Sequence, residues 1–493
     1  MRKLQPTSGN QSPTSTAPRK YKMTTAIPSD ITTPDKVETS IGALNFFDGV
    51  PTEETAKKAY DQLDLTRGIE TFLNGIPGAS MVELRQGSRD VGSVNGTVGI
   101  FQNLMDSKSL FLTPNSESIY YATWIDLKNG PIVIESAPNV LGVVNDFWFR
   151  YVCDMGNAGP DKGQGGKFLI LPPDYKGTPP RGYFTFKSPT YGNLVLGRGF
   201  MKDGSTQAAD DAIRQHMRVY PLAEAGMPHE AKFVDLSGRE MNTVHSNDFK
   251  FYGELNQIVQ EEPEDSYGPD MMGLFNSIGM VKGKPFAPDE RMKKTLTDAV
   301  AIGNSIARSI DFRNRSTEAP IYPGQHWNTP FIGGSYQWLT KGGARNFDAR
   351  TMFYYAATVN TPAMAMAMPG IGSQYASANL DAKGAPFDGS KIYRLHVPAN
   401  VPVKDFWSVV LYDTQTRSML QTDQQFPSLS SQTNPKKNAD GSVDVYFSST
   451  KANADNWIQT IPGKSWFTIF RLYGPLQPWF DKTWELPDIE QAQ

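Results

Sequence analysis

Short runs of aromatic and β-branched residues, separated by turn residues, recur in two stretches of the chain. In the first stretch they cover residues 118–126, 131–135, 146–153, 168–171, 183–186 and 194–196. In the second they cover residues 393–397, 407–412, 443–447 and 466–473. Runs of this length, bounded by Gly, Pro, Asn and Asp, are typical of β-strands. Their cadence predicts two antiparallel β domains of the sandwich or jelly-roll type.

Three other stretches place apolar residues three and four positions apart, which is the spacing of an amphipathic helix. The first begins near residue 51, and Gly75 and Pro77 are expected to end it. The second covers residues 210–220, and the third runs from residues 288–290 to about 311. The third helix lies between the two β stretches, so we expect a helical region to join the two β domains.

These elements predict a chain that is mainly β with helical segments, in the α+β class. The expected organisation is a disordered tail at residues 1–33, an N-terminal helical segment at 34–84, a first β domain at 85–235, a helical bridge at 236–375 and a second β domain at 376–493. A second methionine, Met23, follows the polar start of the chain. Whether the first 22 residues belong to the mature protein therefore stays open.

Composition excludes several classes of protein. The net charge of −3 and the charged fraction of 20% are too ordinary for a nucleic-acid partner. The single cysteine, Cys153, cannot form an intrachain disulfide or a multi-cysteine zinc site. No run approaches the ~18–20 apolar residues of a membrane span, and the N-terminus has no signal-peptide pattern, so we expect a cytoplasmic protein. The many aromatic residues at strand positions favour a homo-oligomer.

Longer motifs carry a resemblance to known families. In the first β stretch they are FLTPNSESIY at 111–120, WIDLKNGP at 124–131 and GPDKGQGGKFLILP at 159–172. In the second they include GAPFDG at 384–389, KDFWS at 404–408, DGSVD at 440–444 and RLYGP at 471–475. With these motifs the chain resembles the paired families named domain of unknown function 1254 and 1214, over about residues 34–490. The resemblance implies two β-sandwich or jelly-roll domains joined by helical segments, often in oligomers, and it implies no particular reaction or cofactor.

The familiar catalytic signatures are absent from the sequence. It contains no Walker phosphate loop, no H-E-x-x-H, no G-x-S-x-G and no C-x-x-C. No two of the five histidines stand at metal-ligand spacing, so no metal site is predicted. His326 lies in a predicted loop among aromatic and amide residues, and loops carry functional groups more often than strand faces do. We therefore take His326 as a candidate catalytic residue.

Polar and charged residues gather around the first β stretch beyond what turns require. The candidate ligand-binding residues are Asn115, Tyr120, Lys162, Lys167 and Arg198. The glycines at 163, 165 and 166 predict a tight turn, although Asp161, Lys162 and Lys167 beside free backbone amides would also suit an anion.

Two carboxylates bracket the run 146–153. Asp146 and Asp154 would share one face of an unbroken strand, at its two ends and too far apart for one compact site. Asp154 is the one near the glycine turn, and it is the second candidate catalytic residue. The leading functional hypothesis is a hydrolase that acts on a small molecule or glycan, with its pocket in or near the first β domain. The alternative is a non-catalytic ligand-binding or assembly module of the jelly-roll type.

Arg471 lies in the predicted strand 466–473, on a face that it shares with apolar side chains. An unpaired guanidinium on a buried face is costly, so Arg471 is expected to have a carboxylate or several carbonyl partners. Asp444 and Asp413 are the candidate carboxylates. Either Arg471 only positions strands, or it binds an anion between the two domains.

Overall fold

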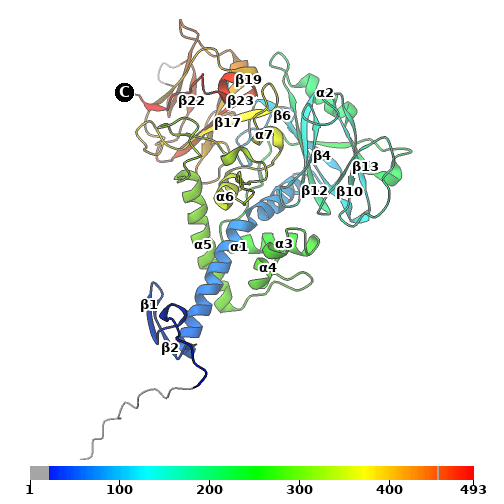
Figure 1. Cartoon of the computed structure of the whole chain (residues 1–493). Helices are drawn as coiled ribbons and strands as arrows, with labels where there is room; N and C mark the ends of the chain where they lie inside the picture. The colour runs from blue at the N-terminus through cyan, green and yellow to red at the C-terminus, as the bar shows by residue number, and fades with distance from the viewer. Residues whose placement is uncertain (1–21, 452–454, 493) are drawn as a thin grey trace, which may run out of the picture. The chain divides into compact units, whose positions relative to one another are not determined.

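The computed structural model describes residues 22–451 and 455–492, and the chain divides into two compact units, residues 1–63 and 64–493. Figure 1 shows the whole chain. Of the expected tail at residues 1–33, residues 1–21 lie outside the described residues. Residues 22–33 are exposed and contain one short 3-10 helix, η1 (Ser29–Ile31).

The first unit begins with strands where a helical segment was expected. Three short antiparallel strands form one sheet: β1 (Lys36–Thr39), β2 (Gly42–Phe47) and β3 (Val50–Pro51). Gly42 has a φ of 96°, which suits the tight turn between β1 and β2. The long helix α1 (Glu53–Asp90) follows directly.

Helix α1 continues past the residues that were expected to end it. Pro77 lies inside the helix. A β-carbon at Gly75 would come within 2.5 Å of Leu255, and one at Gly78 within 2.7 Å of the Trp148 ring. Both glycines therefore let neighbouring side chains approach the helix axis, and neither terminates the helix. The sequence prediction was wrong because a packing glycine and a stop glycine look alike in a single sequence.

The first β region, residues 97–242, contains two main sheets. The six-stranded sheet has the order β14-β4-β6-β12-β8-β9, and the four-stranded sheet the order β11-β10-β7-β13. Apolar side chains from both sheets share one core cluster, which includes Val144, Val195, Ile134 and Phe168. The bounds are β4 (Thr97–Ile100), β5 (Ser109–Leu110), β6 (Ser118–Asp126), β7 (Ile132–Ser136), β8 (Val140–Asp146), β9 (Tyr151–Gly156), β10 (Gly166–Leu171), β11 (Phe184–Lys187), β12 (Gly192–Phe200), β13 (Arg218–Pro221), β14 (Lys232–Asp235) and β15 (Met241–Asn242).

Two details of this region differ from the sequence prediction. Strands β10 and β11 pair in parallel, as do β4 and β14, so the sheets are not purely antiparallel. The stretch 210–220 is a helix only in its first part. Helix α2 (Gln207–His216) ends at His216, and strand β13 begins at Arg218.

Helices occupy much of the chain between the two β regions. They are α3 (Lys250–Glu261), α4 (Pro269–Ser277), α5 (Glu290–Phe312), α6 (Phe347–Ala356) and α7 (Pro362–Ala365). The start of α5 agrees with the prediction, because the Asp289 carboxylate accepts a hydrogen bond from the Met292 amide at 2.7 Å. Helix α1 packs on α5 and α3 within the second unit, where Gly68 faces Ala299 and Phe72 faces Gly303.

The second β region, residues 373–491 with the short strand β16 before α6, also has two main sheets. Their orders are β16-β17-β23-β19-β20 and β22-β21-β18-β24, and β21 pairs with β22 in parallel. The bounds are β16 (Trp327–Asn328), β17 (Ser373–Ala378), β18 (Tyr393–Val397), β19 (Val403–Asp413), β20 (Ser428–Ser430), β21 (Val443–Ser448), β22 (Trp457–Gln459), β23 (Trp466–Pro475), α8 (Gln477–Phe480) and β24 (Glu490–Gln491). The fold is therefore a mixed α+β structure, as predicted.

No helix within residues 22–451 and 455–492 is both long and apolar enough to span a lipid bilayer.

Candidate functional site

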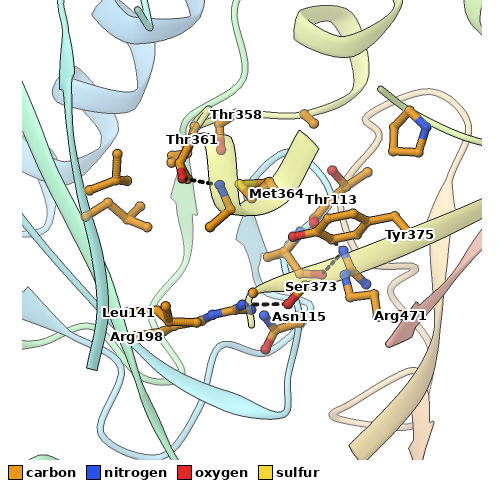
Figure 2. Close-up of a pocket in the computed structure, with 18 of the residues that line it drawn as sticks. Thr113, Asn115, Leu141, Arg198, Thr358, Thr361, Met364, Ser373, Tyr375 and Arg471 are labelled. Carbon is orange, nitrogen blue, oxygen red and sulfur yellow. Dashed lines mark hydrogen bonds between the residues drawn. The ribbon is translucent and has the colours of Figure 1, made fainter. Parts of the chain in front are cut away.

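A cavity of about 130 Å³ is lined by residues of both β regions and of the segment between them. Its polar lining residues are Thr113, Asn115, Tyr120, Asp154, Arg198, Thr358, Thr361, Ser373, Tyr375 and Arg471. Its apolar walls include Phe111, Leu141, Val143, Leu196, Phe331, Phe353 and Ile469. Figure 2 shows part of this lining, with side chains from several separate elements facing one another. A mostly apolar hollow with a few polar groups is typical of a small-molecule site.

The structure brings four of the sequence-predicted residues to this cavity. Asn115 lies before β6, Tyr120 on β6, Arg198 on β12 and Asp154 on β9. They meet because β6, β12, β8 and β9 are consecutive neighbours in one sheet.

Asn115 holds the start of β6 in place. Its side-chain oxygen accepts hydrogen bonds from the Glu117 amide at 3.0 Å and the Ser118 hydroxyl at 2.9 Å. Its amide nitrogen donates to the Tyr120 hydroxyl at 2.7 Å. Burial raises the pKa of Tyr120, and the positive charges of Arg198 and Arg471 oppose the shift. The Tyr120 hydroxyl is therefore neutral and is fixed toward the cavity by Asn115.

Arg471 reaches the cavity from β23, and its partners are neutral. It donates hydrogen bonds to the Tyr412 hydroxyl and to the carbonyl oxygens of Thr113, at 2.7 Å, and Pro114, at 3.4 Å. The two carboxylates proposed from sequence are taken elsewhere, since Asp413 pairs with Lys464 and Asp444 with His396. The expectation of a carboxylate partner was wrong, and the alternative of several carbonyl partners is confirmed.

Arg198 approaches the cavity from the other β region. One guanidinium nitrogen donates to the Ser373 hydroxyl at 2.7 Å, and the guanidinium lies 5.1 Å from the centre of the Tyr473 ring. In the part of the chain that the structure describes, no carboxylate lies within ion-pair distance of Arg198 or Arg471. Figure 2 shows both guanidiniums extending toward the space around Ser373 and Asn115.

Asp154 is the carboxyl group of the cavity. It lies on β9 opposite Val143 of β8 and is 7% exposed. Burial raises its pKa to about 7, and hydrogen bonding with the hydroxyls of Thr361 and Tyr151 opposes the shift. A carboxyl group that titrates near neutral pH can give up or accept a proton under ordinary conditions.

The raised pKa of Asp154 predicts a pH-dependent effect of the substitution Asp154→Asn on stability. Between the unfolded pKa of about 4 and the folded pKa of about 7, the folded protein holds a proton that the unfolded chain has released. This carboxyl group therefore makes the wild type less stable as the pH rises through that window. Asparagine cannot ionise. We expect the variant to gain about 1–3 kcal/mol in free energy of unfolding, relative to wild type, between pH 5 and pH 8. Urea unfolding at pH 5 and pH 8 measures the free energy of unfolding of variant and wild type. If the difference between the two proteins is the same at both pH values, the raised pKa is contradicted.

Three sequence-predicted residues lie outside the cavity. His326 donates its backbone amide to one Asp488 carboxylate oxygen at 2.8 Å, and its Nδ1 lies 3.0 Å from the other. Lys167 pairs with Glu135 at 2.9 Å on the four-stranded sheet. Lys162 lines a separate groove that adjoins the cavity. The structure therefore does not bring His326 together with Asp154.

The glycine-rich turn at 156–166 is held by its own aspartate. Asp161 accepts hydrogen bonds from the Gly156 amide at 2.8 Å and the Gly165 amide at 3.2 Å. Gly163 and Gly165 have φ values of 76° and 79°, which few other residues adopt. Because the amides of Gly156 and Gly165 already donate to the Asp161 carboxylate, the segment fits a tight turn better than an anion-binding site.

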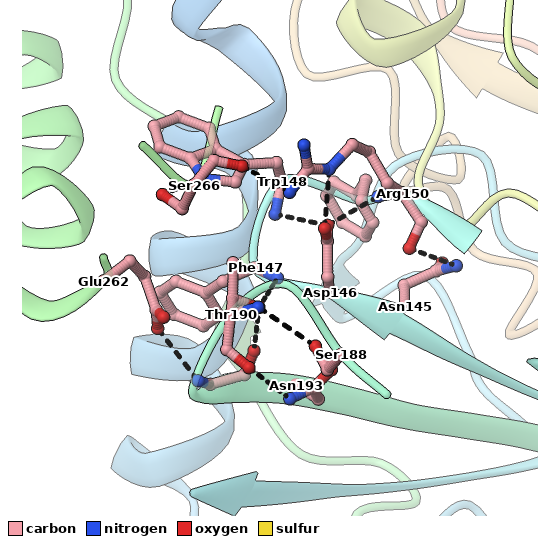
Figure 3. Close-up of polar contacts among 12 residues, drawn as sticks. Asn145, Asp146, Phe147, Trp148, Arg150, Ser188, Thr190, Asn193, Glu262 and Ser266 are labelled. Carbon is pink, nitrogen blue, oxygen red and sulfur yellow. Dashed lines mark hydrogen bonds and ion pairs between the residues drawn. The ribbon is translucent and has the colours of Figure 1, made fainter. Parts of the chain in front are cut away.

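The run 146–153 is a hairpin and not the single strand that was predicted. Asp146 ends β8, and its carboxylate accepts hydrogen bonds from the amides of Trp148, at 2.9 Å, and Arg150, at 2.8 Å, and from Arg150 Nε at 2.6 Å (Figure 3). Phe149 has a φ of 56°, so the chain reverses there. Asp146 and Asp154 therefore lie on adjacent strands, and Asp146 caps a turn instead of facing the cavity.

Sequence reasoning missed the cavity residues of the later segments. Ser373 and Tyr375 lie on β17, whose register pairs Tyr375 with Arg471. Thr361 is the N-terminal cap of α7, and its hydroxyl accepts from the Ala363 amide at 3.0 Å. Gly372, with a φ of 71°, lets the chain pass so close to α7 that a β-carbon would lie 2.1 Å from the Ala363 carbonyl. Neither spacing nor composition singles out these residues.

Other buried titratable groups lie outside the cavity. Burial raises the pKa of the Cys153 thiol well above its ordinary value, which leaves the thiol protonated and a poor nucleophile. Burial, with the charge of Arg417, lowers the pKa of His245 to about 3, so that histidine is neutral. Within the described residues, no group of three or more His, Cys, Asp or Glu side chains has the geometry to hold a metal ion.

Comparison with known proteins matches two segments of the chain to family models. Residues 96–221 match the model described as protein of unknown function (DUF1254), and residues 372–477 match that described as protein of unknown function (DUF1214). Both families predicted from the sequence motifs are thereby confirmed. No curated protein matches the chain.

Two solved structures are similar to this chain. The VPA0106 protein from Vibrio parahaemolyticus is 17% identical, with 87% of this chain and 100% of that chain covered and a TM-score of 0.53. An uncharacterized protein from Burkholderia cenocepacia is 12% identical, with 88% and 95% covered and a TM-score of 0.37. At 17% identity, the likeness to the Vibrio protein concerns the fold alone.

Proposed function

From the premise that this chain carries one DUF1254 domain and one DUF1214 domain, we propose that it is an enzyme acting on a small molecule in the cavity between them. Asp154 is the proposed general acid–base group. The observation that carries the proposal is that a buried carboxyl group and two guanidiniums without carboxylate partners face one cavity. Both matched segments contribute, since 96–221 supplies Asp154 and Arg198, and 372–477 supplies Ser373 and Arg471.

The chemistry of the lining supports an enzyme more than an assembly module. An assembly surface needs exposed complementary area, whereas a buried carboxyl group that titrates near pH 7 inside a cavity is typical of a catalytic site. Burial keeps Asp154 close to the point where it can change protonation state, because the cavity wall around it is apolar. We also propose that each β region is a two-sheet sandwich, which would form a rigid wall on either side of the cavity.

The reaction class that we propose is hydrolysis. Asp154 in its carboxylate form would accept a proton from a water molecule as the water oxygen bonds to the substrate carbon. The same group would then give that proton to the leaving atom as its bond to the carbon breaks. Proton and electron count balance without a further reactant.

The test is a hydrolase screen on the full chain with ester, amide and glycoside substrates between pH 5 and pH 9. We expect turnover that rises with pH through about 7, as Asp154 ionises. The variant Asp154→Asn is expected to lose about 10²–10⁴-fold in kcat/KM, the usual contribution of a general acid–base group.

The matched control is Glu254→Gln. Burial raises the pKa of Glu254 to about 7 as well, but this residue accepts hydrogen bonds from the Ser246 amide in the helical region and does not line the cavity. Its replacement is expected to leave kcat/KM unchanged. Equal activity of wild type and Asp154→Asn would contradict the proposal, and so would the absence of turnover across all substrate classes. The second outcome would favour the alternative, a non-catalytic binding protein that uses the same cavity.

A further inference from the structure

We propose that the cavity takes a small monocarboxylate with an apolar body of about one ring, its carboxylate held between Arg198 and Arg471. This inference rests on the proposed function, because it names the substrate class of the same cavity. Four independent features carry it: the unpaired guanidiniums, their common location, the count of charges around them, and the cationic groove that adjoins the cavity.

The two guanidiniums have only neutral hydrogen-bond partners. Arg471 is 3% exposed, and its partners are carbonyl oxygens and the Tyr412 hydroxyl. Arg198 has the Ser373 hydroxyl. Burying a cation without an opposite charge is costly, and a bound anion would remove much of that cost. Arginine also presents a planar fork of donors that matches a carboxylate.

The two arginines line the same cavity, Arg198 from β12 and Arg471 from β23. Strand register places Arg198 opposite Tyr120 and Arg471 opposite Tyr375, and all four side chains line the same space. The positive charge of each guanidinium acts on the Tyr120 hydroxyl and lowers its pKa against the effect of burial. Both charges are therefore close to one point, where a single carboxylate could meet them.

Two acidic groups enter the count of charges, Glu117 beside the cavity and Asp154 in its lining. Glu117 is buried beside this end of the cavity, where burial raises its pKa and Arg471 opposes the shift. It accepts hydrogen bonds from Ser116 at 2.8 Å and Ser408 at 3.2 Å instead of pairing with either arginine. The raised pKa favours the neutral form of Glu117, whereas Asp154, in the carboxylate form that the proposed mechanism uses, offsets one of the two positive charges. One remains, which matches a monoanion better than a dianion.

A cationic groove adjoins the cavity. The groove, of about 780 Å³, shares Leu141 and Gly372 with the cavity lining and contains Lys162, Lys202 and Lys404 against one carboxylate, Asp405. None of these lysines has an ion pair with a described residue. A surface of this sign attracts anions to the entrance of a site and raises their association rate.

The size of the cavity limits the body of the ligand. At about 130 Å³ it is close to the roughly 150 Å³ engineered cavity that holds benzene. Its walls there are Phe331, Phe353, Leu196 and Ile469. An aromatic or branched aliphatic ring suits these walls, and the carboxylate would point toward the arginines.

The experiment is calorimetric titration of the full chain with phenylacetate, its neutral amide phenylacetamide, and phenyl phosphate as the dianion. We expect wild type to bind phenylacetate at least about tenfold more tightly than either of the others, because only the carboxylate leaves no charge unmatched. Arg198→Met is expected to abolish this preference. It is the main variant because Arg198 has a single side-chain hydrogen bond. Arg471→Lys, which keeps the charge, is expected to weaken phenylacetate binding without abolishing the preference for it.

Lys167→Met is the matched control, since Lys167 lies outside both the cavity and the groove and should not change the preference. Equal binding of acid and amide, no binding of any probe, or tighter binding of phenyl phosphate would overturn the inference, as would an unchanged preference in Arg198→Met. The variant Asp154→Asn separates this inference from the proposed function. If it still binds phenylacetate but no substrate is turned over by wild type, the catalytic proposal fails and the carboxylate site stands. If Asp154→Asn loses turnover and the protein shows no preference for the carboxylate, the catalytic proposal stands and the carboxylate site fails.

Discussion

Replacing Trp148 by alanine is expected to lower the free energy of unfolding by about 3–5 kcal/mol, the usual cost of removing a large buried aromatic side chain. Trp148 is 1% exposed, at the tip of the β8–β9 hairpin. Its ring stacks on Tyr267 with the ring centres 4.1 Å apart and the planes 5° apart. Its Nε1 donates to the Ser266 hydroxyl at 3.1 Å; Figure 3 shows Trp148 and Ser266. A β-carbon at Gly78 of α1 would lie 2.7 Å from the Trp148 ring, so the ring packs closely against the helix.

Two further variants divide this effect into its parts. Trp148→Phe keeps an aromatic ring and should cost less than the alanine variant. Ser266→Ala removes only the hydrogen-bond partner of the indole, and we expect it to cost about 1 kcal/mol. Equilibrium unfolding in urea measures all three. A loss below about 1 kcal/mol for Trp148→Ala would show that this hairpin does not help hold the first β region against the helices.

Replacing Arg471 by methionine is expected to cost about 3 kcal/mol or more in free energy of unfolding. The guanidinium is buried, and its loss leaves the carbonyl oxygens of Thr113 and Pro114 without a donor. It also removes the nearest positive charge from the buried Glu117 carboxyl group. Because these partners belong to the segment before β6 and Arg471 belongs to β23, the substitution breaks a contact between the two β regions.

The comparison variant for this prediction is Arg198→Met. Arg198 is only partly buried and makes one side-chain hydrogen bond, so its replacement should cost about 1 kcal/mol or less. Denaturant unfolding of both variants at the same pH measures the two losses in free energy of unfolding. Equal losses would mean that Arg471 serves the cavity alone and does not position strands.

The elements that were predicted well from sequence are the ones whose own residues carry a strong local signal. The run 118–126 became β6 and the run 393–397 became β18 with the same ends. In β18 burial alternates along the strand as the residues at 393–397 do, so little long-range information is needed, whereas β6 is buried on both faces at residues 123–125 and was recognised by its β-branched and aromatic residues. The N-terminus of α5 was predicted for a similar reason, because its cap is a local interaction between Asp289 and Met292.

The failures occur where a residue's role depends on what packs against it. Gly75 was expected to help end the first helix, but it makes room for Leu255 of α3, and no local signal distinguishes this role from a helix stop. Asp146 was expected to share one strand with Asp154, but it ends β8, and its carboxylate accepts three hydrogen bonds that exist only once the chain turns back at Phe149. His326 stood out as a loop histidine, yet its partner is Asp488, 162 residues later in the chain.

By itself the sequence determined the α+β class and the two families, and it singled out four residues that line the cavity: Asn115, Tyr120, Asp154 and Arg198. Only the tertiary structure decided that Arg471, Ser373 and Tyr375 face those four residues across a shared cavity. The physical reason is that local periodicity states which face of a strand is buried but not what lies opposite. The partners of the Arg471 guanidinium, Thr113 and Pro114, are more than 350 residues away in the chain, at separations of 358 and 357. A cavity built from such contacts exists only after the two β regions have met.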